Sequence, residues 1–144
     1  MGKYDKIKLE NQLCFSLYAL SREVIKLYKP ILDKYNLTYT QYITMLVLWE
    51  EEKIIFKELG KRLHLDSGTL TPVVKKLEAM GLVIKYRNVE DDRVVTVELT
   101  EKGKLLKEDI LEVPEKMYCK LKGNDKKIID LKKQLDELMQ LIEE

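Results

Sequence analysis

The fold is decided by residues 56–99, which read FKELGKRLHLDSGTLTPVVKKLEAMGLVIKYRNVEDDRVVTVEL. The spacing of apolar residues predicts a short helix over 56–63, followed by a tight polar turn over 64–68. A second helix then ends at Gly81, because glycine most easily adopts the left-handed backbone conformation that follows a helix. Two helices joined by a short turn form a helix-turn-helix unit.

Two segments after this unit change the period of the pattern. Residues 83–87 and 94–99 are rich in β-branched side chains, and residues 88–92 between them are polar and acidic. This arrangement predicts a two-stranded hairpin with a long tip. A helix-turn-helix followed by a hairpin is a winged helix-turn-helix, so we expect a mainly α fold with a small β wing.

The beginning of the second helix is ambiguous because of Pro72. Proline is favoured at the first helical position, which would make Thr71 the cap and leave a short helix. The alternative is a longer helix that begins earlier and tolerates the proline near its start. The sequence allows both.

Side chains suited to DNA lie on the second helix and the hairpin. Hydroxyl side chains at a helix N-terminus can reach base edges or phosphates, later basic residues can contact the DNA backbone, and a wing-tip arginine can enter the minor groove while an acidic neighbour orients it. The candidate DNA-binding residues are Ser67, Thr69, Thr71, Lys75, Lys76, Arg87, Asp91 and Arg93. The simpler alternatives are a helical domain whose hydroxyl cluster is only a cap, and a solvated basic face.

The flanking segments predict long helices. Residues 7–35 carry apolar side chains at spacings of three and four and predict one helix, which Pro30 should kink or end. Thr38 and Gln41 form a capping-box pattern that opens the next helix. After the hairpin, Thr100 caps a further helix that should bend at Pro114.

The last segment predicts an interface between subunits. Residues 123–125 interrupt the chain before a final helix whose apolar residues repeat at spacings of three and four, the pattern of a helix packed along another helix. We therefore expect one domain over 1–144, in which helices 7–35 and 101–144 form a homodimer and residues 38–100 form the winged DNA-binding lobe.

Composition narrows the class of protein. The chain has 144 residues, of which 45% are hydrophobic and 35% charged, and its formal net charge is +1. These values indicate a soluble globular domain, with neither signal peptide nor membrane span, in the cytoplasm. A single histidine and two cysteines argue against a metal site, and we expect no cofactor. Basic residues outnumber acidic ones over 57–87, a surplus that suits phosphates.

Cys14 lies near the start of the first helix. Free cysteine is often buried as a small hydrophobic residue, which is the simplest interpretation. The thiolate is the reactive form, and neighbouring hydroxyl groups favour it. If Cys14 is reactive, its oxidation could control DNA binding by the second helix and the wing. If Cys14 is buried, it has only a structural role.

Three stretches resemble the MarR family of dimeric repressors: Asp66–Pro72, Glu90–Arg93 and Leu99–Gly103. Residues 8–15, with the tyrosines that follow, look like its peroxide-sensing branch, the organic hydroperoxide resistance repressors. The resemblance covers nearly the whole chain. It implies a homodimer that binds a pseudo-palindromic double-stranded operator through two winged lobes, and a regulator rather than an enzyme.

The resemblance also implies roles for single residues. Cys14 is the residue that organic hydroperoxide oxidises, and its thiolate accepts hydrogen bonds from Tyr18, Tyr28 and Tyr39. Along a helix Tyr28 lies about 21 Å from Cys14, so we expect the sensor to be shared between two subunits. Cys119 resembles a resolving cysteine, although a small thiol could take that role.

The sequence therefore predicts a repressor that releases its operator when Cys14 is oxidised. One alternative is a MarR-type repressor that binds a phenolic compound and in which Cys14 is inert. A second alternative, from another class, is a thiol peroxidase. Such an enzyme would not need the hydroxyl-rich helix or the arginine at the wing tip.

Overall fold

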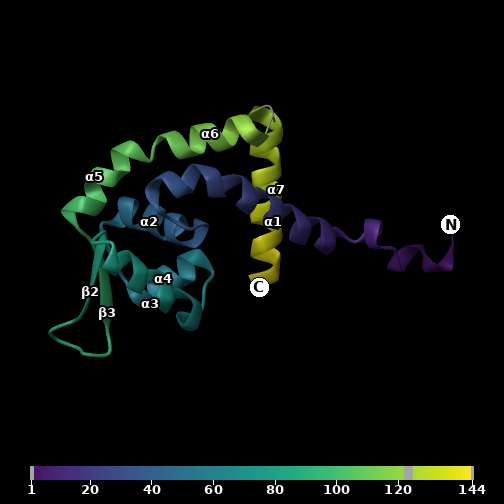
Figure 1. Cartoon of the computed structure of the whole chain (residues 1–144). Coiled ribbons are helices and arrows are strands. Elements are labelled where there is room, and N and C mark those ends of the chain that lie inside the picture. The colour runs from purple at the N-terminus through teal and green to yellow at the C-terminus, as the bar shows by residue number, and fades with distance from the viewer. Residues whose placement is uncertain (1, 122–124, 144) are drawn as a thin grey trace. The chain divides into compact units, whose positions relative to one another are not determined.

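A computed structural model describes residues 2–121 and 125–143. The chain divides into two compact units, one ending at Leu111 and one beginning at Glu112. The first unit contains α1 (Leu13–Leu32), α2 (Tyr39–Glu51), β1 (Lys53–Ile55), α3 (Phe56–Leu63), α4 (Ser67–Ala79), β2 (Val83–Arg87), β3 (Val95–Leu99) and α5 (Glu101–Asp109) (Figure 1). The second contains α6 (Glu112–Leu121) and α7 (Asp125–Glu143). The mainly helical fold with a small β wing is confirmed.

The first helix begins later than predicted. Two short 3-10 turns, Lys3–Ile7 and Leu9–Asn11, precede α1, so the expectation of one helix over 7–35 is wrong at its N-terminal end. The side-chain amide of Gln12 donates 2.8 Å hydrogen bonds to the carbonyls of Lys6 and Lys8, and these bonds hold the chain in turns. Side-chain bonds of this kind compete with helix formation.

The end of α1 matches the expectation for Pro30. The proline occupies the last turn of α1, and the helix stops at Leu32 before a further 3-10 turn over Asp33–Tyr35. Asn36 then adopts a left-handed conformation with φ of 58°. Proline removes one helical hydrogen bond, and here the helix ends within one turn of that loss.

The predicted capping box opens α2. The backbone N–H of Gln41 donates to the Thr38 hydroxyl at 3.3 Å, and the backbone N–H of Thr38 donates to the Gln41 side chain at 3.0 Å. The helix is buried on most of its surface, with Met45 and Leu48 fully enclosed. It is the central helix of the winged lobe.

The second helix of the helix-turn-helix, α4, has the longer of the two forms that the sequence allowed. Asp66 is the cap of α4, and its carboxylate accepts a 2.7 Å hydrogen bond from the backbone N–H of Thr69. Pro72 therefore lies inside the helix. Gly81 follows with φ of 76°, as predicted for the residue after the helix end.

The sheet has three strands, whereas the sequence pattern predicts two. Strands β2 and β3 form the predicted hairpin, which projects from the helices (Figure 1), and β1 pairs antiparallel with the other edge of β3. The register places Ile54 and Lys85 on either side of Val97. β1 continues directly into α3 and is only three residues long, so it is too short for an alternating pattern to be recognised.

The core of the winged lobe lies where α2, α3 and α4 pack against the inner face of the sheet. Its fully buried members are Leu48, Leu59, Leu70, Val74, Leu77 and Val97. Among the described residues, every buried polar side-chain atom has a hydrogen-bond partner. The lobe therefore offers a rigid support for α4 and the wing.

The helix expected over 101–121 is two helices. α5 starts at the predicted cap, where the Thr100 hydroxyl accepts a hydrogen bond from the backbone N–H of Gly103, and it ends at Asp109. α6 begins at Glu112, so the interruption precedes Pro114 rather than bending the helix there. Pro114 has no N–H for the carbonyl of Ile110, and its ring crowds that carbonyl.

The final helix expected after the interruption is present in the structure as α7. The interruption expected over 123–125 lies largely outside the described residues, and α7 begins at Asp125 as a regular helix. The Tyr118 hydroxyl of α6 bonds to the Asp125 carboxylate. No residue of α7 is buried. Within the described part of the chain, no helix is both long and apolar enough to cross a membrane.

Candidate functional site

The hydroxyl side chains predicted to meet DNA lie at the start of α4. Ser67, Thr69 and Thr71 are exposed, while Leu70 of the same helix is buried. The Thr71 hydroxyl donates a 2.6 Å hydrogen bond to the carbonyl of Ser67, which fixes its orientation. The helix thus turns one face to the core and presents hydroxyl groups on the other.

The cap of α4 is an ionised carboxylate. The backbone N–H of Thr69 donates to Asp66, and this bond, with a further one from the Thr69 side chain, lowers the pKa of the carboxyl group. Lys75 and Lys76 lie further along α4 and are both exposed. A basic helix face with a fixed N-terminus suits contact with phosphates.

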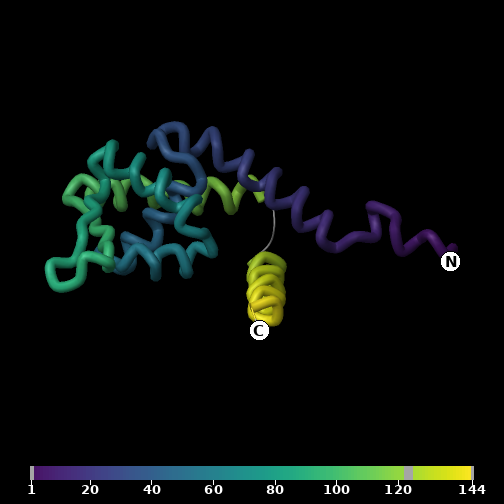
Figure 2. Tube along the Cα trace, turned by 90° about the horizontal axis from the view of Figure 1, so that it is seen from below, coloured from purple at the N-terminus to yellow at the C-terminus, as the bar shows by residue number. Residues whose placement is uncertain are grey.

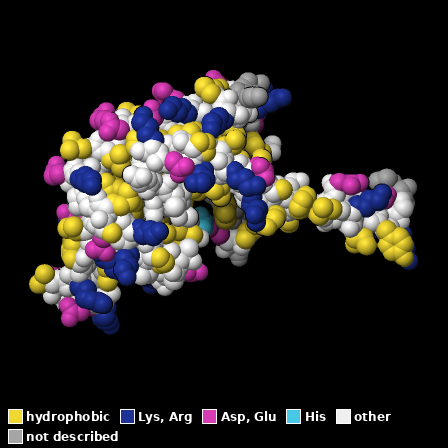
Figure 3. Space-filling view, in the orientation of Figure 1, with side chains coloured by type: hydrophobic (Ala, Val, Ile, Leu, Met, Phe, Trp, Pro, Cys, Tyr) yellow, Lys and Arg dark blue, Asp and Glu magenta, His cyan; other side chains and the backbone are white. Residues whose placement is uncertain are grey.

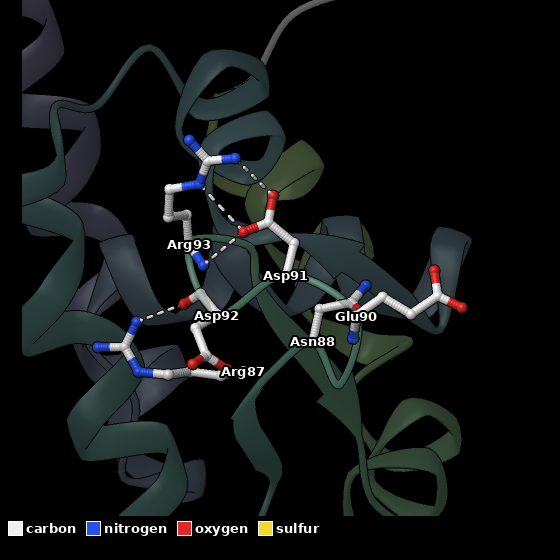
Figure 4. A network of polar contacts seen from close by, with 6 residues as sticks. All are labelled: Arg87, Asn88, Glu90, Asp91, Asp92 and Arg93. Atoms are coloured by element: carbon white, nitrogen blue, oxygen red, sulfur yellow. Dashed lines mark hydrogen bonds and ion pairs between the residues drawn. The ribbon is translucent and has the colours of Figure 1, made fainter.

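The wing tip holds Arg93 in a defined position (Figure 4). Its Nε lies 3.1 Å from Oδ1 of Asp91, and its backbone N–H donates to the same oxygen at 3.0 Å. These bonds lower the pKa of Asp91. The Arg93 side chain is nevertheless 91% exposed, so the guanidinium remains accessible from outside.

Arg87 lies at the base of the same loop. It is the last residue of β2, and its guanidinium donates a 2.7 Å hydrogen bond to the carbonyl of Asp92 (Figure 4). Lys85, two residues earlier on the strand, places its ammonium group 5.1 Å from the centre of the Phe56 ring. The two basic side chains thus differ in what they contact.

Three tyrosines from α1 and α2 form one aromatic cluster. The ring centres of Tyr28 and Tyr39 are 4.8 Å apart, and Tyr42 lies 5.8 Å from Tyr28 and 6.4 Å from Tyr39. Tyr28 and Tyr39 were predicted from the sequence as sensor residues, and Tyr42 was not. Its position three residues after Tyr39, on the same helix face, was the available signal.

Burial keeps the phenols of this cluster protonated. It raises the pKa of Tyr28 to about 12, with smaller contributions from the neighbouring Tyr39 and Tyr42 phenols. Burial also raises the pKa values of Tyr39 and Tyr42. A protonated phenol can donate a hydrogen bond, so the cluster is suited to stabilise an anion such as a thiolate.

Cys14 and Tyr18 are not part of this cluster. Cys14 lies in the first turn of α1 and is exposed. Tyr18 follows one turn later, and its hydroxyl accepts a 2.9 Å hydrogen bond from Arg22. Since α1 rises about 1.5 Å per residue, Tyr28 is about 21 Å further along it. A single chain therefore brings Tyr28 and Tyr39 together but leaves Cys14 apart from them.

The N-terminal part of the first unit is an apolar arm. The 3-10 turns and the start of α1 stand away from the winged lobe (Figure 2), and hydrophobic side chains follow this arm (Figure 3). The exposed apolar side chains here are Tyr4, Ile7, Leu9, Leu13, Phe15 and Tyr18. Several large apolar side chains exposed on one projecting segment mark a site of protein association.

A pocket of about 350 Å³ lies beside the tyrosine cluster. Tyr28 and Tyr39 line it together with apolar side chains that include Ile25, Leu32 and Leu37. It can receive an apolar group and place that group next to the two phenols.

The other sequence features have simple outcomes. Cys119 lies on α6 in the second unit, and its thiol is free and exposed. Among the described residues, no group of three or more His, Cys, Asp or Glu side chains is arranged to hold a metal ion.

The chain has relatives among known regulators. A model of the family of SarA/Rot transcriptional regulators matches residues 26–110. The organic hydroperoxide resistance transcriptional regulator of Bacillus subtilis is 48% identical over 141 residues, which are 98% of this chain and 96% of that protein.

Solved structures agree with these sequence matches. A structure of reduced AbfR bound to DNA, a protein of Staphylococcus epidermidis, has a TM-score of 0.85 and 34% identity, and the match covers 99% of this chain and 97% of that one. A disulfide-formed structure of AbfR has a TM-score of 0.67, also at 34% identity, over 95% and 96% of the two chains.

Proposed function

Since the chain belongs to the MarR-type winged-helix family of transcriptional regulators, which includes the SarA/Rot and organic hydroperoxide resistance regulators, we propose that it is a homodimeric repressor that releases its operator when Cys14 is oxidised. It is a regulator and not an enzyme, so a thiol peroxidase is set aside. The oxidant is an organic hydroperoxide, and the compartment is the cytoplasm.

One observation carries this proposal: the two halves of the sensor are separated within one chain. Cys14 is exposed on the apolar arm, while Tyr28, which pairs with Tyr39 of α2, lies about 21 Å away along α1. Two first helices that cross antiparallel in a dimer bring Cys14 of one subunit to Tyr28 of the other. The exposed apolar surface of the arm supports such a crossing.

The proposed chemistry is a two-electron oxidation of the thiolate. The sulfur of Cys14 attacks the terminal oxygen of the hydroperoxide, so an S–O bond forms and the O–O bond breaks. Cys14 becomes a sulfenic acid, and the alkoxide takes up a proton and leaves as an alcohol. The sulfenic acid then condenses with a second thiol, which yields a disulfide and releases water.

The oxidised sulfur no longer accepts the phenol hydrogen bonds. The arm and α1 then lose the contacts that fixed them against the partner subunit. A shift of the two winged lobes changes the spacing of their α4 helices, which must match half-sites about 34 Å apart on DNA. Operator affinity falls as a result.

A gel shift tests the switch. The reduced protein is incubated with the DNA upstream of its own gene, with and without cumene hydroperoxide, and Cys14→Ser is the matched control. We expect the peroxide to release the wild-type protein and to leave the variant bound. Equal survival of both complexes would overturn the proposal.

We further propose that Cys119 resolves the sulfenic acid across the dimer. The two free, exposed thiols and the resemblance to two-cysteine family members support this role. Non-reducing electrophoresis after one equivalent of hydroperoxide should give a dimer band that disappears in Cys119→Ser. If the wild type gives no dimer band and carries a small thiol bound to Cys14, that thiol and not Cys119 is the resolving group.

A second candidate function is regulation by a small phenolic ligand, with Cys14 inert. The apolar pocket beside Tyr28 and Tyr39 favours it. Release of the Cys14→Ser variant from DNA by salicylate, at concentrations that also release the wild type, would support this alternative.

A further inference from the structure

We propose that Arg87 is a positioning residue of the wing: it fixes the loop that presents Arg93 to DNA. The inference rests on the proposed function, because it assumes that the wing contacts DNA. From the sequence, Arg87 is one of the candidate DNA-binding residues. Its hydrogen bond to the carbonyl of Asp92 points to a different role.

The loop that carries Arg93 is closed by its own hydrogen bonds. The backbone N–H of Asn88 donates to the carbonyl of Val94 at 2.7 Å, and the N–H of Val94 donates to the carbonyl of Asp91 at 3.0 Å. The N–H of Glu90 donates to the Asn88 side chain at 2.9 Å. These bonds fix the course of the loop, but each lies within the loop itself.

Arg87 ties this loop to the sheet. Asp92 is the middle residue between Asp91 and Arg93, the carboxylate and guanidinium that bind each other. The Arg87 bond fixes the carbonyl of that middle residue, and Arg87 itself belongs to β2, which is paired along its length with β3. A charged donor makes this hydrogen bond stronger than an ordinary one.

The two arginines of the wing have different roles in this arrangement (Figure 4). Arg93 is almost fully exposed and carries the positive charge outward. The guanidinium of Arg87 instead donates to the carbonyl of Asp92. Loss of Arg87 should therefore act through Arg93, because a loosened loop no longer holds Arg93 in the orientation that the minor groove requires.

Hydrogen exchange in the free protein tests the brace without DNA. In Arg87→Met the amides of residues 88–94 should exchange several-fold faster than in the wild type, while the remaining amides keep their rates. Lys85→Met is the matched control, since this substitution also removes a positive charge from β2. The Lys85 side chain lies over the Phe56 ring and not against the loop. Unchanged exchange in Arg87→Met would overturn the inference.

A double-mutant cycle tests the coupling on operator DNA. We expect Arg93→Met to weaken binding about tenfold. Arg87→Met should weaken binding less, and it should have no further effect in the Arg93→Met background. Lys85→Met should change affinity by the same factor in both backgrounds. Equal, multiplying effects of Arg87→Met in both backgrounds would make Arg87 a direct phosphate contact and overturn the inference.

The failures of the two proposals are distinguishable. If wild-type protein binds no operator, the proposed function fails, whereas the exchange experiment still reads the brace. If the wild type binds and Arg93→Met binds equally well, Arg93 does not contribute to DNA binding. The role given to Arg87 is then overturned, whereas the proposed repressor function, with DNA bound through α4, is unaffected. Thermal unfolding of each variant checks that the lobe remains folded.

Discussion

The indole Nε1 of Trp49 donates a 2.9 Å hydrogen bond to the main-chain oxygen of Gly103, although the two residues are 54 positions apart. The bond is buried and joins α2, the central helix of the winged lobe, to the first turn of α5. Two further bonds join this junction to the residues that follow α4: Thr100 donates to the carbonyl of Gly81, and Lys102 donates to that of Met80. The start of α5 is thus firmly attached to the lobe.

Gly103→Ala should disrupt this junction. A Cβ at position 103 would lie 2.4 Å from the carbonyl oxygen of Leu82 and 2.7 Å from the side chain of Leu99, so backbone and core must shift. We expect the free energy of unfolding to fall by about 1–3 kcal/mol. Urea titrations followed by fluorescence measure this directly, because Trp49 is the single tryptophan.

Gly68→Ala is the control for this substitution. A Cβ at position 68 comes no closer than 3.4 Å to the Asp66 carboxylate, in the first turn of α4. Alanine in an unhindered helical position should leave stability unchanged or raise it by about 0.5–1 kcal/mol. Equal stability of the two variants would show that the contacts around Gly103 adjust without cost.

Tyr28 should titrate late. Burial raises its pKa from 10.0 to about 12, so the folded protein binds the phenolic proton more tightly than the unfolded chain does. The stabilising contribution is complete below pH 10 and is lost as the pH rises toward 12. The phenolate absorbance of wild type minus that of Tyr28→Phe gives the titration curve of this residue. A midpoint at the ordinary value of 10.0 would contradict the effect of partial burial on this phenol.

Local rules predicted the ends of several elements correctly. The caps at Thr38 and Thr100 and the left-handed Gly81 involve contacts within three residues along the chain, which a sequence displays directly. The separation of Cys14 from Tyr28 also follows from sequence, since it depends only on the rise of a helix.

Other features depend on contacts between distant residues. β1 is recognisable as a strand only through its pairing with β3, which brings Lys53 beside Glu98. The place of Tyr42 in the aromatic cluster requires the packing of α1 on α2. At the N-terminus, the apolar spacing continues before Leu13, but the Gln12 amide selects turns instead of helix. Periodicity does not contain these side-chain bonds.

Tyr42 should control how fast Cys14 is oxidised. Its ring is 4% exposed and contacts both Tyr28 and Tyr39, so Tyr42→Leu frees the two phenols to move. We expect oxidation of Cys14 by hydroperoxide to slow roughly 2- to 10-fold, because the two phenols lose the aromatic contacts that hold them in place. Loss of free thiol in a Cys119→Ser background measures this rate.

Tyr42→Phe separates the ring from the hydroxyl group. It keeps the aromatic contacts and should oxidise at the wild-type rate. A rate as slow as that of Tyr42→Leu would assign the effect to the Tyr42 hydroxyl, and a normal rate in Tyr42→Leu would remove Tyr42 from the sensor.

Leu135→Asp should dissociate the dimer. The apolar residues of α7 lie along one stripe with spacings of three and four, and Leu135 at its centre is 39% exposed although its neighbours in the stripe are also apolar. A carboxylate placed in a helix–helix seam must lose its hydration, so we expect the dimer to weaken by about a hundredfold or more. Sedimentation equilibrium over a range of protein concentrations measures the dimer dissociation constant.

Lys133→Asp is the control, because it introduces the same carboxylate on the opposite face of α7 and should remain dimeric. If both variants sediment as the wild type does, the stripe is not the seam, and the apolar arm alone must hold the subunits together.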